Sequence, residues 1–255
     1  MDGKGAYAAI VCGEIYVGGE RIRDPKKRIP EDAFVEHRAG GYVGRGGLKL
    51  EGALDDFGVD PSGLVCLDAG ASTGGFTDCL LTRGAEAVHA VDVGYNQLAW
   101  KLRSDPRVIV RERTNIMALE SGCLIPPPAM AVADLSFRSL RGAASKLLSL
   151  TGGGIVLVLV KPQFENPEEI GFDGVVRTGE ARSRVLDALR RDLPSEGVHV
   201  LDAAASRLPG RKGNAEIFLR LASVPPADAA YVDGRIRRAL DDADRLSGDS
   251  GDAGS

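Results

Sequence analysis

Residues 65–76 read Val65-Cys66-Leu67-Asp68-Ala69-Gly70-Ala71-Ser72-Thr73-Gly74-Gly75-Phe76, and this stretch decides how the rest of the chain folds. A short apolar run ends in an acidic residue, a Gly-rich turn follows, and a helix-like segment begins at Phe76. This order presents backbone N–H groups and a helix N-terminus to a ligand. Asp92 ends the next apolar run, where a second-strand carboxylate binds a ribose. We therefore expect a nucleoside-containing cofactor at this turn.

The spacing of the turn narrows the choice of cofactor. Gly70 and Gly75 fit the first and sixth positions of the dinucleotide fingerprint, but Ser72 fills the third, which disfavours NAD. No Gly-Lys-Ser/Thr follows, so a Walker-type phosphate loop is absent from the sequence. Asp68 suits a ligand with a cationic amino group, and S-adenosylmethionine has that group, a sulfonium and a ribose. The alternative is a turn that only connects a strand to a helix.

Composition and charge limit the class of protein. The 255 residues, 44% hydrophobic and 27% charged, suit one mid-sized globular domain with appendages. A net charge of −4 argues against wholesale nucleic-acid binding, although basic residues gather in 21–28, 103–113 and 207–212. The start has no signal-peptide pattern and the apolar runs are of strand length, which predicts a cytoplasmic protein without a membrane contact. Four scattered cysteines predict reduced thiols and no metal site.

The chain alternates between strand-like and helix-like segments from residue 64 onward. We expect strands at 64–68, 87–92, 107–111, 129–134, 154–160, 197–203 and 215–222, and helices at 48–57, 74–83, 96–103, 138–149, 178–193 and 228–246. Such alternation predicts an α/β fold with a mostly parallel sheet of seven strands. The last two strands are too close in sequence for a helical crossover, so they should form an antiparallel hairpin.

The remaining segments are predicted from their turn residues and composition. Gly18-Gly19 joins two short strands in a hairpin within a small N-terminal module. Residues 164–177 are expected to form a loop over the site, and residues 247–255, which are Gly, Ser, Asp and Ala, to be disordered.

Charged residues follow two neighbouring apolar strands. Asp134 ends the run 130–133, and Lys161 ends the run 155–160. A charge at such a position needs a partner if it is buried, so we expect Asp134 and Lys161 to pair at the sheet rim. Lys49, which follows the Gly-rich stretch 44–48, and Glu216 at the start of the last strand are expected to join them. The alternative is a set of structural salt bridges.

Two lysines and two carboxylates beside a sulfonium site favour methyl transfer to a hydroxyl. A ribose hydroxyl must lose its proton as the methyl group arrives, and a neutral lysine can accept it. We expect Lys161 to be that base, with Asp134 and Glu216 orienting it. Lys49 is expected to position the hydroxyl or to favour the neutral form of Lys161 through like-charge proximity.

Seven motifs in order closely resemble the TlyA-type, haemolysin-named rRNA methyltransferases of the FtsJ-like 2′-O-methyltransferase group. The resemblance covers about residues 42–222 and includes Arg45–Leu50, Asp68–Phe76, Val91–Tyr95, Glu112–Asn115, Ala133–Phe137, Val160–Phe164 and Gly213–Glu216. It implies a class I methyltransferase (Rossmann-like) fold with the substrate a cytidine 2′-hydroxyl of ribosomal RNA or ribosomal subunits. It also implies a catalytic tetrad of Lys49, Asp134, Lys161 and Glu216. The implied S-adenosylmethionine contacts are Asp68, Gly70, Ala71, Ser72, Thr73, Gly74, Gly75, Phe76, Asp92 and Asn115.

The resemblance also implies three regions. Residues 1–43 are expected to be a truncated alpha-L-type RNA-binding module with its linker, because the chain begins almost at the hairpin. Residues 44–225 would be the methyltransferase domain, and 226–255 a C-terminal helix and tail. Gly44, where Ser is common in the family, is expected to loosen the linker. A homodimer is compatible with the sequence, and the competing functions are a membrane-active haemolysin and a degenerate RNA-binding factor without catalysis.

Overall fold

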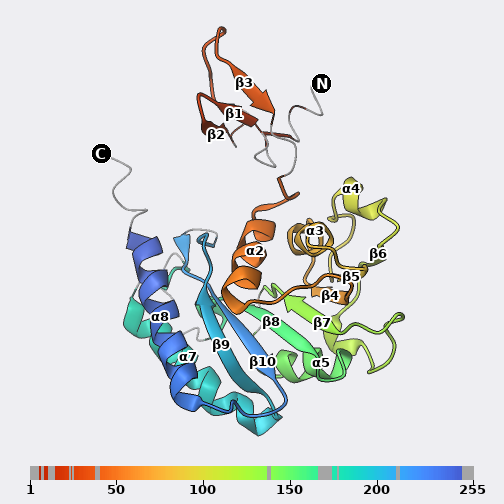
Figure 1. The fold of residues 1–255 in the computed structure, drawn as a ribbon, viewed down its shortest axis with the longest axis vertical. Helices are drawn as coiled ribbons and strands as arrows, with labels where there is room; N and C mark the ends of the chain where they lie inside the picture. The colour runs from red at the N-terminus through yellow and green to blue at the C-terminus, as the bar shows by residue number, and fades with distance from the viewer. Residues whose placement is uncertain are drawn as a thin grey trace.

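The computed structural model contains two β-sheets, a small N-terminal one and a larger one flanked by helices (Figure 1). It describes residues 6, 9–10, 15–22, 24, 26–37, 41–136, 139–165, 174–176, 178–210 and 213–248. The larger sheet has the strand order β6-β5-β4-β7-β8-β10-β9. Its strands are β4 (Val65–Ala69), β5 (Ala87–Val91), β6 (Val108–Arg111), β7 (Met130–Ala133), β8 (Ile155–Val160), β9 (His199–Ala205) and β10 (Ile217–Ala222).

The larger sheet is parallel except at one edge. β6, β5, β4, β7 and β8 run parallel, whereas β10 is antiparallel to both β8 and β9. This confirms the predicted seven-stranded, mostly parallel sheet with a terminal antiparallel hairpin. The strand order reverses between β4 and β7, and open α/β sheets bind ligands beyond the carboxyl ends of their strands at such a switch point.

Helices cover both faces of the larger sheet. They are α2 (Arg45–Phe57), α3 (Gly75–Thr82), α4 (Trp100–Arg103), η1 (Ile116–Ala118), α5 (Ala143–Leu150), α6 (Pro162–Glu165), α7 (Gly179–Asp192), η3 (Leu193–Glu196) and α8 (Ala229–Gly248). One apolar core lies between the sheet and α5, α7 and α8, and the other between the sheet and α2 and α3. Successive residues of β7 enter the two cores alternately, because side chains alternate across a strand that is buried on both faces.

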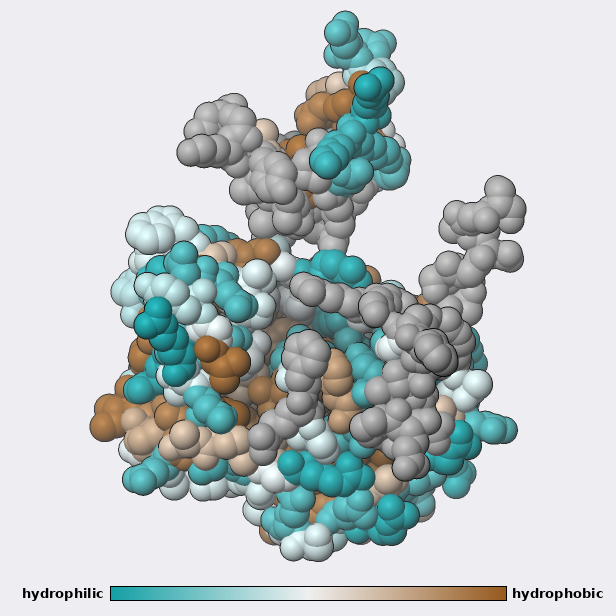
Figure 2. All heavy atoms as spheres, turned by 180° about the vertical axis from the view of Figure 1, so that it is seen from behind, coloured by the Kyte–Doolittle hydropathy of each residue, from teal (hydrophilic) through white to brown (hydrophobic). Residues whose placement is uncertain are grey.

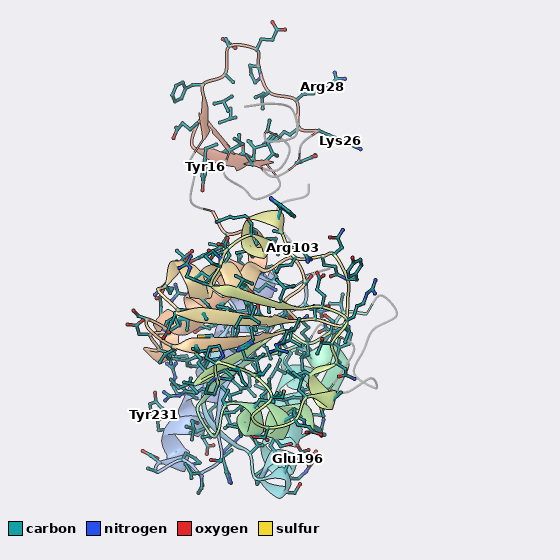
Figure 3. All side chains as sticks on the ribbon, turned by 90° about the vertical axis from the view of Figure 1, so that its right-hand side faces the viewer. Tyr16, Lys26, Arg28, Arg103, Glu196 and Tyr231 are labelled. Carbon is teal, nitrogen blue, oxygen red and sulfur yellow. The ribbon has the colours of Figure 1, made fainter. Side chains whose placement is uncertain are left out.

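The N-terminal sheet has three short strands, β1 (Ile15–Val17), β2 (Glu20–Ile22) and β3 (Val35–His37), in the order β2-β1-β3. Gly18 and Gly19 both have positive φ, as a two-residue hairpin turn requires, so the predicted hairpin is confirmed. The sequence pattern did not predict β3, whose three residues are too few to show a periodicity. Figure 3 shows Lys26 and Arg28, from the loop between β2 and β3, with their side chains extending outward.

Three predicted boundaries are wrong, each for a local reason. The helix predicted over 96–103 begins only at Trp100, since Asn96 adopts a φ of 57° that an α-helix does not accept. The helix predicted over 138–149 begins at Ala143, after the left-handed Gly142. The predicted loop 164–177 starts inside α6, which Pro162 begins; residues 166–173 and 177 lie outside the described residues. α8 continues to Gly248, and the rest of the predicted tail also lies outside them.

Helices α2 and α3 meet at glycines. A Cβ atom on Gly75, the first residue of α3, would lie 2.9 Å from the backbone nitrogen of Gly47 and 3.2 Å from the Cα atom of Gly46. Only a residue without a side chain permits this approach. The contact holds the first turn of α2, and therefore Lys49, against the Gly-rich turn that precedes α3.

We predict that Gly75→Ala destabilises the protein by about 1–3 kcal/mol, because the added methyl group must push α2 and α3 apart. The matched control is Gly234→Ala in α8, where an added Cβ would have no atom within 4 Å. That variant should gain about 0.5–1 kcal/mol from helix propensity. Urea unfolding measures both changes, and equal shifts of the same sign in the two variants would contradict the close contact.

Candidate active site

The Gly-rich turn between β4 and α3 is fixed by backbone hydrogen bonds to the end of β5. The N–H groups of Gly70 and Ala71 both donate to the carbonyl of Val91, at 2.8 and 3.1 Å. The N–H of Ser72 donates to Asp92 Oδ2 at 2.8 Å. The turn and the acidic residue that follows β5 are thus one rigid unit, as two parts of a nucleoside site should be.

Gly70 also joins this turn to the end of β7. It has a φ of 84°, and a Cβ atom there would lie 2.7 Å from the carbonyl oxygen of Asp134. The N–H of Asp134 in turn donates to the carbonyl of Ala69 at 3.0 Å. The candidate cofactor turn and the first candidate catalytic residue are therefore in backbone contact.

Asp68 lies beneath the turn and is fully buried. Its Oδ2 atom accepts a hydrogen bond from Thr77 Oγ1 at 2.6 Å, which ties β4 to the first turns of α3. Burial raises the pKa of Asp68 to about 7, although its hydrogen bonds to Thr77 oppose the shift. The Oδ1 atom is buried and has no hydrogen-bond donor among the described residues, so a cationic group of a ligand would satisfy it.

Asp92 and Asn115 lie in the loops that follow β5 and β6. Asp92 is half-buried, and its Oδ1 atom accepts from the N–H of Gly94 at 2.6 Å. Asn115 is exposed, and its side-chain oxygen accepts from the N–H of Met117 at 3.0 Å, which caps η1. Both residues therefore have a structural role. The carboxylate of Asp92 can still accept, and the side-chain amide of Asn115 can still donate, a hydrogen bond to a ligand.

Backbone strain is concentrated at this rim. In the described residues the non-glycine positions with positive φ are Ser72, Asn96 and Arg113, one in each of the loops after β4, β5 and β6. Such strained residues persist where the surrounding structure fixes them, and they are frequent at ligand sites. Val93 is also part of this rim and was missed by the sequence analysis. It is an apolar residue with 72% of its surface exposed, directly after Asp92, and could pack on a flat ring.

These residues fit S-adenosylmethionine. The buried, donor-free oxygen of Asp68 suits a cationic amino group, the carboxylate of Asp92 suits ribose hydroxyls, and Val93 suits an adenine face. At Gly70 itself there is no room for a side chain, because a Cβ atom would meet the carbonyl oxygen of Asp134.

The four charged candidates form two ion pairs. Lys49 of α2 donates to Glu216 Oε2, with side-chain exposures of only 10% and 3%. Lys161 Nζ lies 2.5 Å from Asp134 Oδ1, with exposures of 13% and 29%, and also donates to Ser136 Oγ at 3.0 Å. The predicted pairing of Asp134 with Lys161 is present, but the structure pairs Glu216 directly with Lys49. Glu216 was expected to orient Lys161.

The two pairs lie at one place on the sheet rim. Val160, the residue before Lys161, pairs with Ile217, the residue after Glu216. Burial raises the pKa of Glu216; the charges of Lys49 and Lys161 oppose the shift, and that of Asp134 adds to it. All four charges therefore act on one another, and the more exposed pair, Lys161 with Asp134, is the one that an incoming substrate reaches first.

A buried carboxylate holds the loop after Asp134. Glu165 in α6 accepts hydrogen bonds from Ser139 Oγ at 2.6 Å and from the N–H of Leu140 at 2.7 Å. Burial raises the pKa of Glu165, and its hydrogen bonds to Ser139 and Leu140 and the charge of Arg141 oppose the shift. The sequence carries no signal for the role of Glu165, because only the fold brings it to this loop. Phe137, the last residue of the motif Ala133–Phe137, lies outside the described residues.

The part of the chain that the structure describes has no helix with the length and apolar character needed to cross a membrane. On the face that Figure 2 shows, hydrophobic residues form patches among hydrophilic ones.

Comparison with known proteins gives one consistent family. Residues 42–222 match the model of the FtsJ-like methyltransferase family. The 16S/23S rRNA (cytidine-2′-O)-methyltransferase TlyA of Mycobacterium tuberculosis is 48% identical over 221 residues, which are 85% of this chain and 82% of that protein. Hemolysin A of Brachyspira hyodysenteriae is 35% identical over 83% of this chain and 90% of its own length. A solved structure of a hemolysin-named protein from Streptococcus thermophilus covers 97% of this chain and 92% of its own, with 34% identity and a TM-score of 0.75.

The difference in burial between the two ion pairs predicts different costs of breaking them. Glu216→Ala leaves Lys49 buried without its carboxylate, which should cost about 3–5 kcal/mol of unfolding free energy. Asp134→Ala should cost clearly less, because Asp134 is 29% exposed, so water can replace its carboxylate, and Lys161 keeps Ser136 Oγ. Urea unfolding of the two variants measures the difference, and an equal or larger cost for Asp134→Ala would contradict the assignment of Lys49–Glu216 as the inner pair.

The raised pKa of Asp68 predicts a pH-dependent stability. The folded state favours the neutral carboxyl, so this contribution to stability is present below the ordinary pKa of 3.8 and is lost as pH rises through about 7. Asp68→Asn keeps an uncharged acceptor for Thr77 at every pH. The free energy of unfolding of the parent should therefore fall relative to that of Asp68→Asn between about pH 4 and 7. Urea unfolding across this range gives the comparison, and parallel pH curves would contradict the shift.

Proposed function

The chain belongs to the FtsJ-like methyltransferase family, and from that premise we propose that it methylates a cytidine 2′-hydroxyl of ribosomal RNA with S-adenosylmethionine. The observation that carries the proposal is the contact between the two halves of the site: the candidate cofactor turn touches the backbone of Asp134, whose side chain holds Lys161. Support for the substrate comes from the relative TlyA, 48% identical, which is described as a 16S/23S rRNA (cytidine-2′-O)-methyltransferase.

The residues of the turn and its rim would hold the cofactor. S-adenosylmethionine supplies, when bound, an electrophilic methyl group on its sulfonium. Asp68 meets the amino group through its donor-free oxygen, and Asp92 accepts from the ribose. The backbone of Gly70–Phe76 and the exposed Asn115 line the remaining side. Because Asp92 is fixed by Ser72 and Gly94, the site requires little reorganisation to bind.

Lys161 removes the proton from the 2′-hydroxyl. Its Nζ atom must be neutral before the step and carries the proton after it, so Asp134 Oδ1, at 2.5 Å, stabilises the ammonium that forms. Ser136 Oγ gives Nζ a second contact and so a defined direction. Glu216 holds the cation of Lys49 in place, so Lys49 is fixed for positioning the hydroxyl. Orientation and proton removal together supply the catalysis.

The regions outside the methyltransferase core would bring the RNA to the site. We infer that residues 1–43 are the RNA-binding module and linker, with Lys26 and Arg28 on the exposed loop after β2. Residues 44–225 would be the catalytic domain, and 226–255 a C-terminal addition. A ribosomal substrate implies action in the cytoplasm.

Two substitutions at Lys161 test the proposed base. Lys161→Ala removes the amine, and Lys161→Arg keeps a cation that stays protonated and so cannot accept the proton. Both should lose about 100-fold or more of the methyl-transfer rate while they still bind the cofactor. Transfer of radiolabel from S-adenosylmethionine to unmethylated ribosomal subunits measures the rate, and calorimetry measures cofactor binding.

The same assay separates the proposal from its alternatives. Label in RNA from the parent and none from either variant supports it, whereas equal label from Lys161→Arg would remove Lys161 as the base. The hemolysin-named relatives motivate a second arm with purified protein and red blood cells. Lysis that persists in Lys161→Ala, with no RNA label from the parent, would favour the membrane-active function instead.

A further inference from the structure

A cleft outside the candidate active site lies between α2, β9 and α8, and its volume is about 390 Å³. Arginines are the main charged residues along it, opposed by two aspartates. The arginines are Arg207, Arg235, Arg238 and Arg245, and the aspartates are Asp56 and Asp242. Ala203–Ala205 of β9 contribute small side chains to the lining. Two of these arginines are held by close carboxylates: Arg207 pairs with Asp55 and Asp56, and Arg235 pairs with Asp202.

The cleft lies at the same end of the sheet as the two catalytic ion pairs. Ala205, the last residue of β9, pairs with Ile217, which pairs in turn with Val160. The N–H of Ser206 donates to the carbonyl of Glu216 at 2.9 Å, and Arg207 is the next residue. The cleft therefore continues the active-site rim toward the β9 edge.

The direction of α8 agrees with this placement. Tyr231, near the start of α8, lies beside Asp202 of β9, with its OH 3.4 Å from Asp202 Oδ2. Arg238 and Arg245, about two and four turns further along α8 than Tyr231, share the cleft with Ala205 and Arg207 at the rim end of β9.

The outer arginines of the cleft are not needed to dock α8. The helix already buries Val232, Ile236, Ala239 and Ala243 in the core against the sheet. Arg235 is the structural arginine, with Nε 2.5 Å from Asp202 Oδ1. By contrast, Arg238 and Arg245 are 75% and 79% exposed and reach Asp242 only at 3.8 and 3.5 Å. Exposed pairs of this kind contribute little to stability, so an anion can replace Asp242 as their partner.

We propose that this cleft binds phosphodiester groups of the substrate RNA that flank the nucleotide at Lys161. The inference rests on the proposed function, since it supplies the path of the RNA strand into that site. Arg238 and Arg245 provide two exposed planar guanidinium forks beside Arg207, and such forks match phosphate oxygens in geometry and charge. The small alanine side chains of β9 let a bulky backbone approach the floor. An open, rim-connected cleft fits a polymer that passes through it better than a small enclosed anion.

Single substitutions of the two exposed arginines test the cleft. Arg238→Gln and Arg245→Gln should each weaken binding of in-vitro-transcribed 16S and 23S rRNA about fivefold at moderate salt, and lower the slope of log K against log salt by about 0.7–0.9. The matched control is Arg191→Gln on α7, an arginine that is 74% exposed and outside the cleft. Filter binding at several salt concentrations measures affinity, and urea unfolding checks that each variant is folded.

The outcomes separate this inference from the proposed function. Weaker RNA binding in both cleft variants, with Arg191→Gln like the parent, supports the cleft. Equal losses in all three variants, or none in the cleft variants, would overturn it. Inorganic phosphate in a parallel arm distinguishes a small-anion site: if millimolar phosphate protects the parent against unfolding but the cleft variants bind RNA normally, the RNA assignment is wrong. A parent that binds RNA through the cleft without methylating it would refute the proposed function alone.

Discussion

The requirement that a buried charge have a partner governs this structure. Lys49 and Glu216 are 167 residues apart in sequence, yet each is almost fully buried and each is the other's counter-ion. An unpaired charge at either position would cost several kcal/mol, so α2 must cross the sheet where the strand after Glu216 begins. That crossing is possible because Gly46 and Gly47 of α2 pack on Gly75 of α3. The pair thus fixes the helix that carries one candidate catalytic lysine to the strands that carry the other residues.

Because the two ion pairs differ in burial, the site has an inner and an outer pair. The inner pair, Lys49 with Glu216, is buried, whereas Lys161 and Asp134 reach the rim where a substrate arrives. The outer pair is in turn adjacent to the Gly-rich turn, since Gly70 packs on the carbonyl of Asp134. A methyl donor on the turn and a hydroxyl at Lys161 would therefore lie close to each other, because the turn is in backbone contact with the residue that pairs with Lys161. This arrangement gives orientation, which is the main need of an in-line transfer between two bound reactants.

The sequence predicted the elements that depend on local pattern and missed contacts that depend on the crossing of elements. Alternating apolar runs and Gly turns located all seven strands of the larger sheet, and strand ends located Asp134 and Lys161 at one rim. The direct pairing of Glu216 with Lys49 was not predicted, because no periodicity reports how α2 crosses the sheet. Glu165 and the arginine cleft were missed for the same reason: the loop held by Glu165 and the packing of α8 on β9 exist only in the folded chain. Helix starts failed where Asn96 and Gly142 adopt left-handed backbone angles that their neighbours impose.

The central claim is that Lys161, held by Asp134, is the group that faces the reacting hydroxyl. The most direct measurement is a structure of the protein with S-adenosylhomocysteine and an RNA fragment that contains the target cytidine. The account predicts that the 2′-oxygen lies within hydrogen-bond distance of Lys161 Nζ, about 2.6–3.2 Å, while Lys49 remains paired with Glu216. A 2′-oxygen that contacts Lys49 instead, with Lys161 still bound only to Asp134 and Ser136, would contradict it.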